Sequence, residues 1–143
     1  MDERFETFTV LINQISRSIR RLKAEEMESM ELKGPHVSCL YYLSKNGPLT
    51  AAELCDRCDE DKAAISRSLE YLEENGYLQC PEGKRYRRQL ILTEKGEAAG
   101  AEISSRIDRF VSIASGDISE SDRLAMYRAL SVISSNLSKL CTK

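Results

Sequence analysis

The stretch from Leu49 to Thr93 carries a series of capping and turn signals that constrains the fold more than any other part of the chain. Thr50-Ala-Ala-Glu53 is a capping box, which predicts the start of one short helix. The acidic run Asp59-Glu-Asp61 ends that helix and caps a second one, which Asn75-Gly76 stops. Two short helices joined by a tight turn and followed by a hairpin form a winged helix-turn-helix, an arrangement suited to binding duplex DNA.

The second short helix, expected from Lys62 to Asn75, is the candidate recognition helix. Its inward face is defined by apolar residues at i, i+4 and i+7, which are Ile65, Leu69 and Leu72. Small and polar residues near its N-terminus face outward, where a recognition helix approaches base edges in the major groove. Ser66 can donate to a base or a phosphate, and Arg67 can read guanine or neutralise a phosphate. The predicted DNA contacts of this helix are Lys62, Ala63, Ser66 and Arg67.

The predicted hairpin holds the most basic segment of the chain. Its strands are expected from Tyr77 to Cys80 and from about Arg87 to Leu92, with Pro81-Glu-Gly83 as turn. Four positive charges and no negative ones lie within residues 83–89, although the whole chain has a formal net charge of −2. Positive charge gathered at one edge would direct DNA to that surface. The candidate DNA contacts of this wing are Lys84, Arg85, Arg87 and Arg88.

Long apolar stripes at helical spacing flank the central unit. Residues from about 3 to 31 carry one stripe, with no Gly or Pro before Gly34-Pro35, which predicts a helix about 42 Å long at 1.5 Å per residue. Its members are Phe5, Phe8, Ile12, Ile15, Ile19 and Leu22. After Thr93, and again after Ser119, capped helices carry similar stripes. Because a small domain does not cover stripes of this length, we expect dimerisation; the alternative is a monomeric bundle with one core.

Four segments in order resemble the MarR family of bacterial regulators. They are Leu49-Thr-Ala-Ala-Glu-Leu, Asp61-Lys-Ala-Ala-Ile-Ser-Arg-Ser-Leu, Leu72-Glu-Glu-Asn-Gly-Tyr-Leu and Leu90-Ile-Leu-Thr-Glu-Lys-Gly96. The resemblance covers essentially the whole chain. It implies a mainly α fold with a small β-hairpin wing (α+β), as a single domain over residues 1–143. Within it, helical dimerisation arms at 3–31 and 97–141 flank a winged helix-turn-helix DNA-binding unit at 36–93.

The same resemblance implies a homodimeric transcription regulator that binds pseudo-palindromic promoter sites, more often as a repressor than as an activator, and it implies no cofactor. Ser66 and Arg67 match recognition-helix positions, and Arg87 or Arg88 matches the wing arginine. Family wings commonly carry an Asp just before that arginine. Here the stretch is Arg85-Tyr-Arg-Arg88, without an acid, so the sequence leaves open which arginine enters the minor groove.

Members of the family often hold a small ligand between the arms and the DNA-binding unit, so relief of repression by a small-molecule effector is expected. The candidate lining residues are Arg17, Arg20, Arg21, His36 and Tyr41. The alternative for the arginines is a solvated basic helix face, and for Tyr41 it is packing. Nothing in the sequence identifies a ligand.

Five cysteines, an odd number, favour free thiols over a disulfide framework. Cys55-Asp-Arg-Cys58 places two thiols on one helix face, which suits a soft metal such as zinc, or else both pack as small apolar residues. The metal alternative lacks further ligands, because the single histidine is distant in sequence. A redox sensor is a further alternative, but Cys39, Cys80 and Cys141 are scattered, without a visible activating base.

Other classes of protein receive little support from the sequence. The start, Met1-Asp-Glu-Arg, is too charged for a signal peptide and no apolar run approaches 18 residues, so we expect a cytoplasmic protein with no membrane partner. No Ser/His/Asp set, glycine-rich phosphate loop or carboxylate pair favours an enzyme. A winged helix used as a protein-interaction module remains, and it predicts weak, unselective DNA binding.

Overall fold

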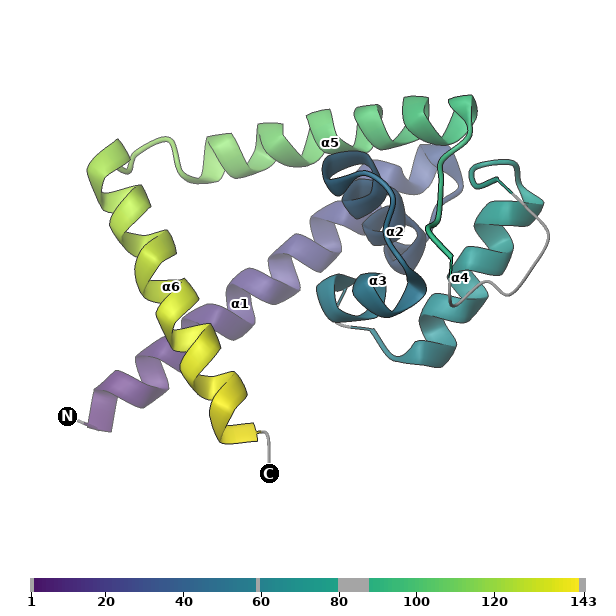
Figure 1. Ribbon diagram of the computed structural model, residues 1–143. Helices are drawn as coiled ribbons and strands as arrows, with labels where there is room; N and C mark the ends of the chain where they lie inside the picture. Colours follow the sequence, from purple (N-terminus) through teal and green to yellow (C-terminus); the bar gives the residue numbers. More distant parts are fainter. Residues whose placement is uncertain (1, 59, 80–87, 142–143) are drawn as a thin grey trace. The chain divides into compact units, whose positions relative to one another are not determined.

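The computed structural model describes residues 2–58, 60–79 and 88–141 (Figure 1). The chain divides into two compact units, Met1–Ile107 and Asp108–Lys143. The described residues form α1 (Asp2–Met27), a 3-10 turn (Glu28–Met30), α2 (Gly34–Asn46), α3 (Ala51–Cys58), α4 (Lys62–Glu74), α5 (Glu94–Ala114) and α6 (Glu120–Cys141). The mainly α fold predicted from the sequence is confirmed.

The N-terminal helix is shorter than its apolar stripe predicts. One helix was expected over residues 3–31, whereas α1 ends at Met27 and Glu31 adopts a left-handed conformation with φ of 58°. On either side of this bend, Met27 is 0% exposed and Leu32 is 5% exposed. The left-handed backbone costs about 1–2 kcal/mol, and burial of the two side chains offsets it with about 1.5–3 kcal/mol each. Tertiary burial therefore ends α1 where no Gly or Pro signals a stop.

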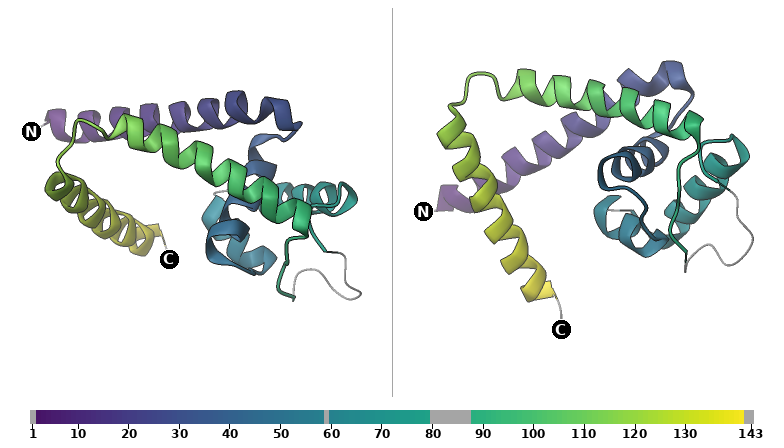
Figure 2. Two further views of the ribbon diagram at one scale, coloured as in Figure 1. Left: turned by 90° about the horizontal axis from the view of Figure 1, so that it is seen from above. Right: turned by 45° about the horizontal axis from the view of Figure 1, so that its top comes forward.

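The core of the larger unit lies where α2 packs against α3 and α4. Figure 2 shows these three short helices gathered into one cluster in both views. The buried side chains of this cluster are Val37, Leu40 and Leu43 from α2, Leu54 from α3, and Ile65, Leu69 and Leu72 from α4. The inward face predicted for the recognition helix is therefore confirmed.

Side-chain caps begin the helices at the predicted positions. At α3, the Glu53 N–H donates to Thr50 Oγ1 at 3.2 Å, and the Thr50 N–H donates to Glu53 Oε1 at 3.1 Å, so the capping box is complete. A main-chain N–H is likewise accepted at the start of α4, α5 and α6 by Asp61 Oδ1 (2.7 Å), Thr93 Oγ1 (3.0 Å) and Ser119 Oγ (3.1 Å). Each cap satisfies a donor that the first turn of a helix leaves unpaired.

The base of the wing is held by two isolated antiparallel bridges, Leu49 with Leu90 and Leu78 with Leu92. The Leu90 N–H donates to the Leu49 carbonyl at 2.8 Å. The segment before α3 is thereby joined to the segment before α5, which ties the wing to the helix-turn-helix. The turn of the predicted hairpin and the residues next to it lie at 80–87, outside the described residues.

The start of α5 passes close to two other segments, and glycine is needed at both contacts. A Cβ on Gly96 would lie 2.0 Å from the carbonyl oxygen of Tyr77, and a Cβ on Gly100 would lie 2.7 Å from the Cβ of Ser44. Further along, the Arg106 guanidinium donates to the carbonyl of Glu26. These contacts hold α5 against the wing base, against α2 and against the end of α1.

The apolar stripes of the terminal helices are formed, and much of their surface is exposed in the single chain. On α1, the exposed fraction of Phe5 is 77%. None of the described residues of α6 is buried, and Leu140 is 71% exposed. No described helix is both long enough and apolar enough to span a membrane.

Candidate nucleic-acid interface

The N-terminal half of α4 presents the predicted recognition residues on one outward face. Lys62, Ala63, Ser66 and Arg67 are all exposed, while the opposite side of the helix is buried against α2 and α3. The cap by Asp61 fixes where this helix begins. A helix whose exposed N-terminal end carries small and basic side chains has the shape and charge to enter a major groove.

A hollow of about 520 Å³ lies between the two helices of the helix-turn-helix. Ala51, Ala52 and Cys55 of α3 line one side, and Ile65 and Leu69 of α4 line the other. Lys62 and Ser66 also line it. The hollow therefore borders the outward face of the recognition helix.

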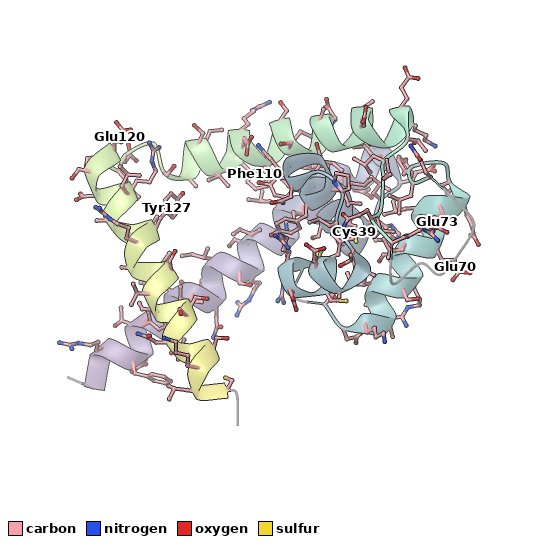
Figure 3. The ribbon with its side chains drawn as sticks, viewed as in Figure 1. Cys39, Glu70, Glu73, Phe110, Glu120 and Tyr127 are labelled. Atoms are coloured by element: carbon pink, nitrogen blue, oxygen red, sulfur yellow. The ribbon has the colours of Figure 1, made fainter. Side chains whose placement is uncertain are left out.

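The wing arginine that the structure describes is bound to the recognition helix. Arg88 Nη2 lies 3.1 Å from Glu73 Oε1, and the side chains are only 19% and 12% exposed. Figure 3 places Glu73 on α4, in its last turn. Arg88 thus holds the base of the wing against the recognition helix. Its predicted contact with DNA stays a prediction, and Lys84, Arg85 and Arg87 lie outside the described residues.

A second cavity, of about 530 Å³, lies between α1, the start of α2 and the end of α3. Its apolar wall is formed by Ile12, Ile15 and Ile19 of α1. Its polar side carries the cations Arg20, Lys23 and Arg57 and the acidic residue Glu60, together with Ser16, Ser38, Tyr42 and Cys58. A volume of this size suits a small molecule.

Of the five predicted effector residues, Arg20 lines this cavity. The other four make different contacts or face solvent. Arg17 is exposed, and Arg21 pairs with Glu25 at 2.9 Å. His36 stacks on Tyr71 with ring centroids 4.1 Å apart, and Tyr41 meets Tyr42 edge to face.

Sequence reasoning missed most of the polar residues that line the cavity, among them Lys23 and Ser38. Lys23 Nζ donates to Ser38 Oγ at 3.5 Å, and burial lowers the pKa of Lys23. Lys23 follows Ile19 at i+4, so continuing the apolar stripe by one turn would have placed its side chain on the inner face of α1. A lysine side chain, however, is rarely buried, so its residue type alone favours a position facing solvent.

The cysteines are arranged differently from the prediction. Cys55 lines the hollow beside α4, whereas Cys58 lines the second cavity, so the two thiols face different spaces. Cys39, one of the three cysteines that are scattered in the sequence, is fully buried on α2, and the neighbouring Cys58 together with burial raises the pKa of its thiol. Within the described ranges, no group of three or more His, Cys, Asp or Glu residues is placed to hold a metal ion.

Known proteins share this arrangement. A profile of the MarR family matches residues 31–85. The uncharacterized HTH-type transcriptional regulator YwoH of Bacillus subtilis (strain 168) is 30% identical over 115 residues, which are 80% of this chain and 84% of that protein. A MarR family transcriptional regulator from Listeria monocytogenes, solved in complex with 26mer DNA, is similar in structure with a TM-score of 0.79 and 22% identity, covering 90% of this chain and 87% of that one. The MarR family protein Rv2887 of Mycobacterium tuberculosis, in complex with p-aminosalicylic acid, has a TM-score of 0.69 and 19% identity, covering 88% and 97%.

A capped pair of helices, an exposed recognition face and a wing base tied to that face define a winged helix-turn-helix protein. The extent and identity of the match to the Bacillus regulator, together with the family profile, identify the particular group. The chain belongs to the MarR family of helix-turn-helix transcriptional regulators.

Proposed function

We propose that this regulator acts as a homodimer that binds pseudo-palindromic promoter DNA and represses transcription until a small ligand binds. The observation that carries the proposal is the outward face of α4, where Lys62, Ala63, Ser66 and Arg67 are exposed together. Ser66 and Arg67 are assigned to the major groove and Lys62 to a phosphate. The wing residues Lys84, Arg85 and Arg87 are assigned to the minor groove or to the backbone beside it.

The terminal helices are the proposed dimerisation arms. Their apolar stripes are exposed in the single chain, and Phe5, Ile15, Leu137 and Leu140 are each at least half exposed. Burial of such apolar surface in a dimer interface would stabilise the dimer by about 25 cal/mol for each square ångström buried. A two-fold dimer, the commonest symmetric assembly, would place two recognition helices in major grooves about 10 bp apart.

The second cavity is the proposed effector site. Arg20, Lys23 and Arg57 outnumber the single carboxylate of Glu60 beside an isoleucine wall, and an excess of positive charge next to an apolar surface suits a small aromatic anion. The Mycobacterium tuberculosis relative was solved with p-aminosalicylic acid, which is such a compound. An effector bound here would contact α1, α2 and α3 together, so it has a route to the helix-turn-helix.

Selection of bound fragments from genomic DNA at physiological salt tests the core of the proposal. We expect a recurrent pseudo-palindrome. Arg67→Ala is then expected to weaken binding by roughly 1–3 kcal/mol and to relax preference at one position of the site. Arg128→Ala, which changes an exposed arginine of α6, serves as the matched control. Salt-sensitive binding without a shared motif would contradict the proposal and favour an interaction module.

A further inference from the structure

Lys23 of α1 is the one lysine among the described residues that is not exposed. It lines the second cavity, and its Nζ donates to Ser38 Oγ of α2 at 3.5 Å. The other lysines that the structure describes are all exposed: Lys33, Lys45, Lys62, Lys95 and Lys139. The fold therefore places one partly buried amine at the polar side of a cavity that is large enough for a small molecule.

The surroundings of this amine favour its neutral form. Burial lowers the pKa of Lys23; Cys58 opposes this effect, and the charge of Arg20 adds to it. A lysine that is desolvated, or that lies next to another cation, is the kind of amine that attacks carbonyl groups, because only the neutral form has a free electron pair. Near neutral pH, a lysine pKa that is lowered by one gives about ten times more of this form. Lys23 is thereby set apart from the exposed lysines as a nucleophile.

The remainder of the second cavity indicates which carbonyl compounds suit this amine. Its isoleucine wall on α1 offers an apolar surface for a flat ring. The guanidinium groups of Arg20 and Arg57 outnumber the carboxylate of Glu60 on the polar side, and arginine binds carboxylates well. An aromatic aldehyde that also carries a carboxylate matches all three features: the apolar wall, the cations and the nucleophilic amine.

We propose that Lys23 binds such an aromatic aldehyde covalently, as an imine, and that the adduct changes DNA binding. The neutral Nζ attacks the carbonyl carbon and a C–N bond forms. One proton passes from the nitrogen to the carbonyl oxygen, which gives a carbinolamine. The C–O bond then breaks, the hydroxyl leaves with a second proton from the nitrogen as water, and the C=N bond forms. No electrons are gained or lost overall, and water reverses the reaction.

The position of Lys23 connects this chemistry to the recognition helix. An imine ties the ligand to α1, while a carboxylate on the same ligand can pair with Arg57 in the last turn of α3. Asp61, four residues after Arg57, caps α4. The bound ligand would therefore link an N-terminal arm to the turn that sets the start of the recognition helix. This regulatory effect rests on the proposed function, whereas the formation of the imine does not.

The chemical test incubates the full-length protein with 4-formylbenzoate, reduces the imine to a stable amine with cyanoborohydride and maps the tryptic peptides. Trypsin does not cleave after an alkylated lysine. The adduct at Lys23 therefore appears as the uncut peptide 22–33, whereas the unmodified chain gives 22–23 and 24–33. An adduct at the exposed reference residue Lys62 appears as peptide 58–67.

We expect Lys23 to be labelled at least about ten times faster than Lys62 at pH 7, because more of its amine is neutral. Labelling of Lys62 at the same rate or faster would overturn the proposal. Benzaldehyde, which lacks the carboxylate, tests the ligand class. Arg57→Gln should slow labelling of Lys23 by 4-formylbenzoate and leave labelling by benzaldehyde unchanged. An equal effect of this variant on both aldehydes would overturn the assignment of an anionic ligand.

The functional test compares the DNA affinity of the full-length protein before and after the adduct is trapped. We expect a change of roughly 5–150-fold, the usual range for coupled sites. Lys23→Arg keeps the positive charge but forms no imine, so it should lose this response. Lys45→Arg, which changes an exposed lysine of α2, is the matched control and should keep it.

The outcomes separate this inference from the proposed function. Equal DNA affinity of the trapped and the untreated protein would overturn the regulatory effect, and the same response in Lys23→Arg would overturn the role of the imine. Failure of the untreated protein to bind DNA at all would instead contradict the proposed function. The peptide map would still decide whether Lys23 forms the adduct.

Discussion

Gly96→Ala tests whether the wing base depends on the close approach of α5. The added Cβ would lie 2.0 Å from the Tyr77 carbonyl oxygen and 3.1 Å from a methyl carbon of Leu92. That oxygen belongs to the backbone and accepts a hydrogen bond from the Thr93 N–H at 3.0 Å, so it cannot rotate away. Overpacking costs about 1–3 kcal/mol and the weakened hydrogen bond about 1 kcal/mol. Alanine in a helix returns about 1 kcal/mol, which leaves a net loss of about 2 kcal/mol.

Urea unfolding of the variant and the parent protein at the same protein concentration measures this loss. Any effect of self-association on the free energy of unfolding then depends on the same concentration in both samples. For a chain of this size, about 2 kcal/mol corresponds to a fall in Tm of about 8 °C. Gly34→Ala at the start of α2 is the matched control, because no atom lies within 4 Å of its Cβ position. It should be neutral or stabilise by up to about 1 kcal/mol. Unchanged stability of Gly96→Ala would refute the steric reasoning, and an equal loss in both variants would assign it to glycine in general.

Three further predictions concern the recognition helix and its supports. Asp61→Ala removes the cap of α4 and should cost about 1 kcal/mol in urea unfolding, whereas Asp61→Asn should retain most of it; equal losses would exclude the cap as the cause. Burial and the charge of Lys33 lower the pKa of His36 from its ordinary value of 6.5. The unfolded chain therefore binds a proton at a higher pH than the folded protein does, so the free energy of unfolding should fall as the pH drops from 6.5 through the lowered pKa. His36→Asn, whose amide oxygen can accept the same bond from the Lys33 N–H, should reduce this fall in thermal melts, and an identical pH profile would contradict the assignment. A double-mutant cycle with Glu73→Gln and Arg88→Met, measured by urea unfolding, should give a coupling free energy of about 0.5–3 kcal/mol. A coupling of zero would show that the ion pair does not stabilise the wing base.

The local structure of this protein could be predicted from the sequence because its signals act over a few residues. The Thr50–Glu53 box and the Asp61 cap each join atoms three residues apart, so a short segment of sequence is enough to predict them. The inward face of α4 follows in the same way from the spacing of Ile65 and Leu69. Once that face was known, the outward position of Arg67 followed from helical geometry alone.

Contacts between distant segments could not be predicted in this way. No local signal ends α1 at Met27; the burial of Met27 and Leu32 decides it. Arg88 looked like one wing charge among several, and only the approach of the wing base to α4 pairs it with Glu73 across 15 residues. Such contacts depend on how the helices pack, and many sequences with the same periodicity would pack differently.

The cysteines illustrate the division most clearly. Spacing alone joined Cys55 to Cys58, because residues three apart share a helix face. Their exposure was decided by the neighbours of α3, which open Cys55 to one hollow and Cys58 to another. The sequence thus determined the helices, their caps and the face that α4 presents, since these depend on local hydrogen bonds and periodicity. The tertiary structure alone decided which side chains from different helices meet, because burial and charge at such contacts depend on chain segments far apart in sequence.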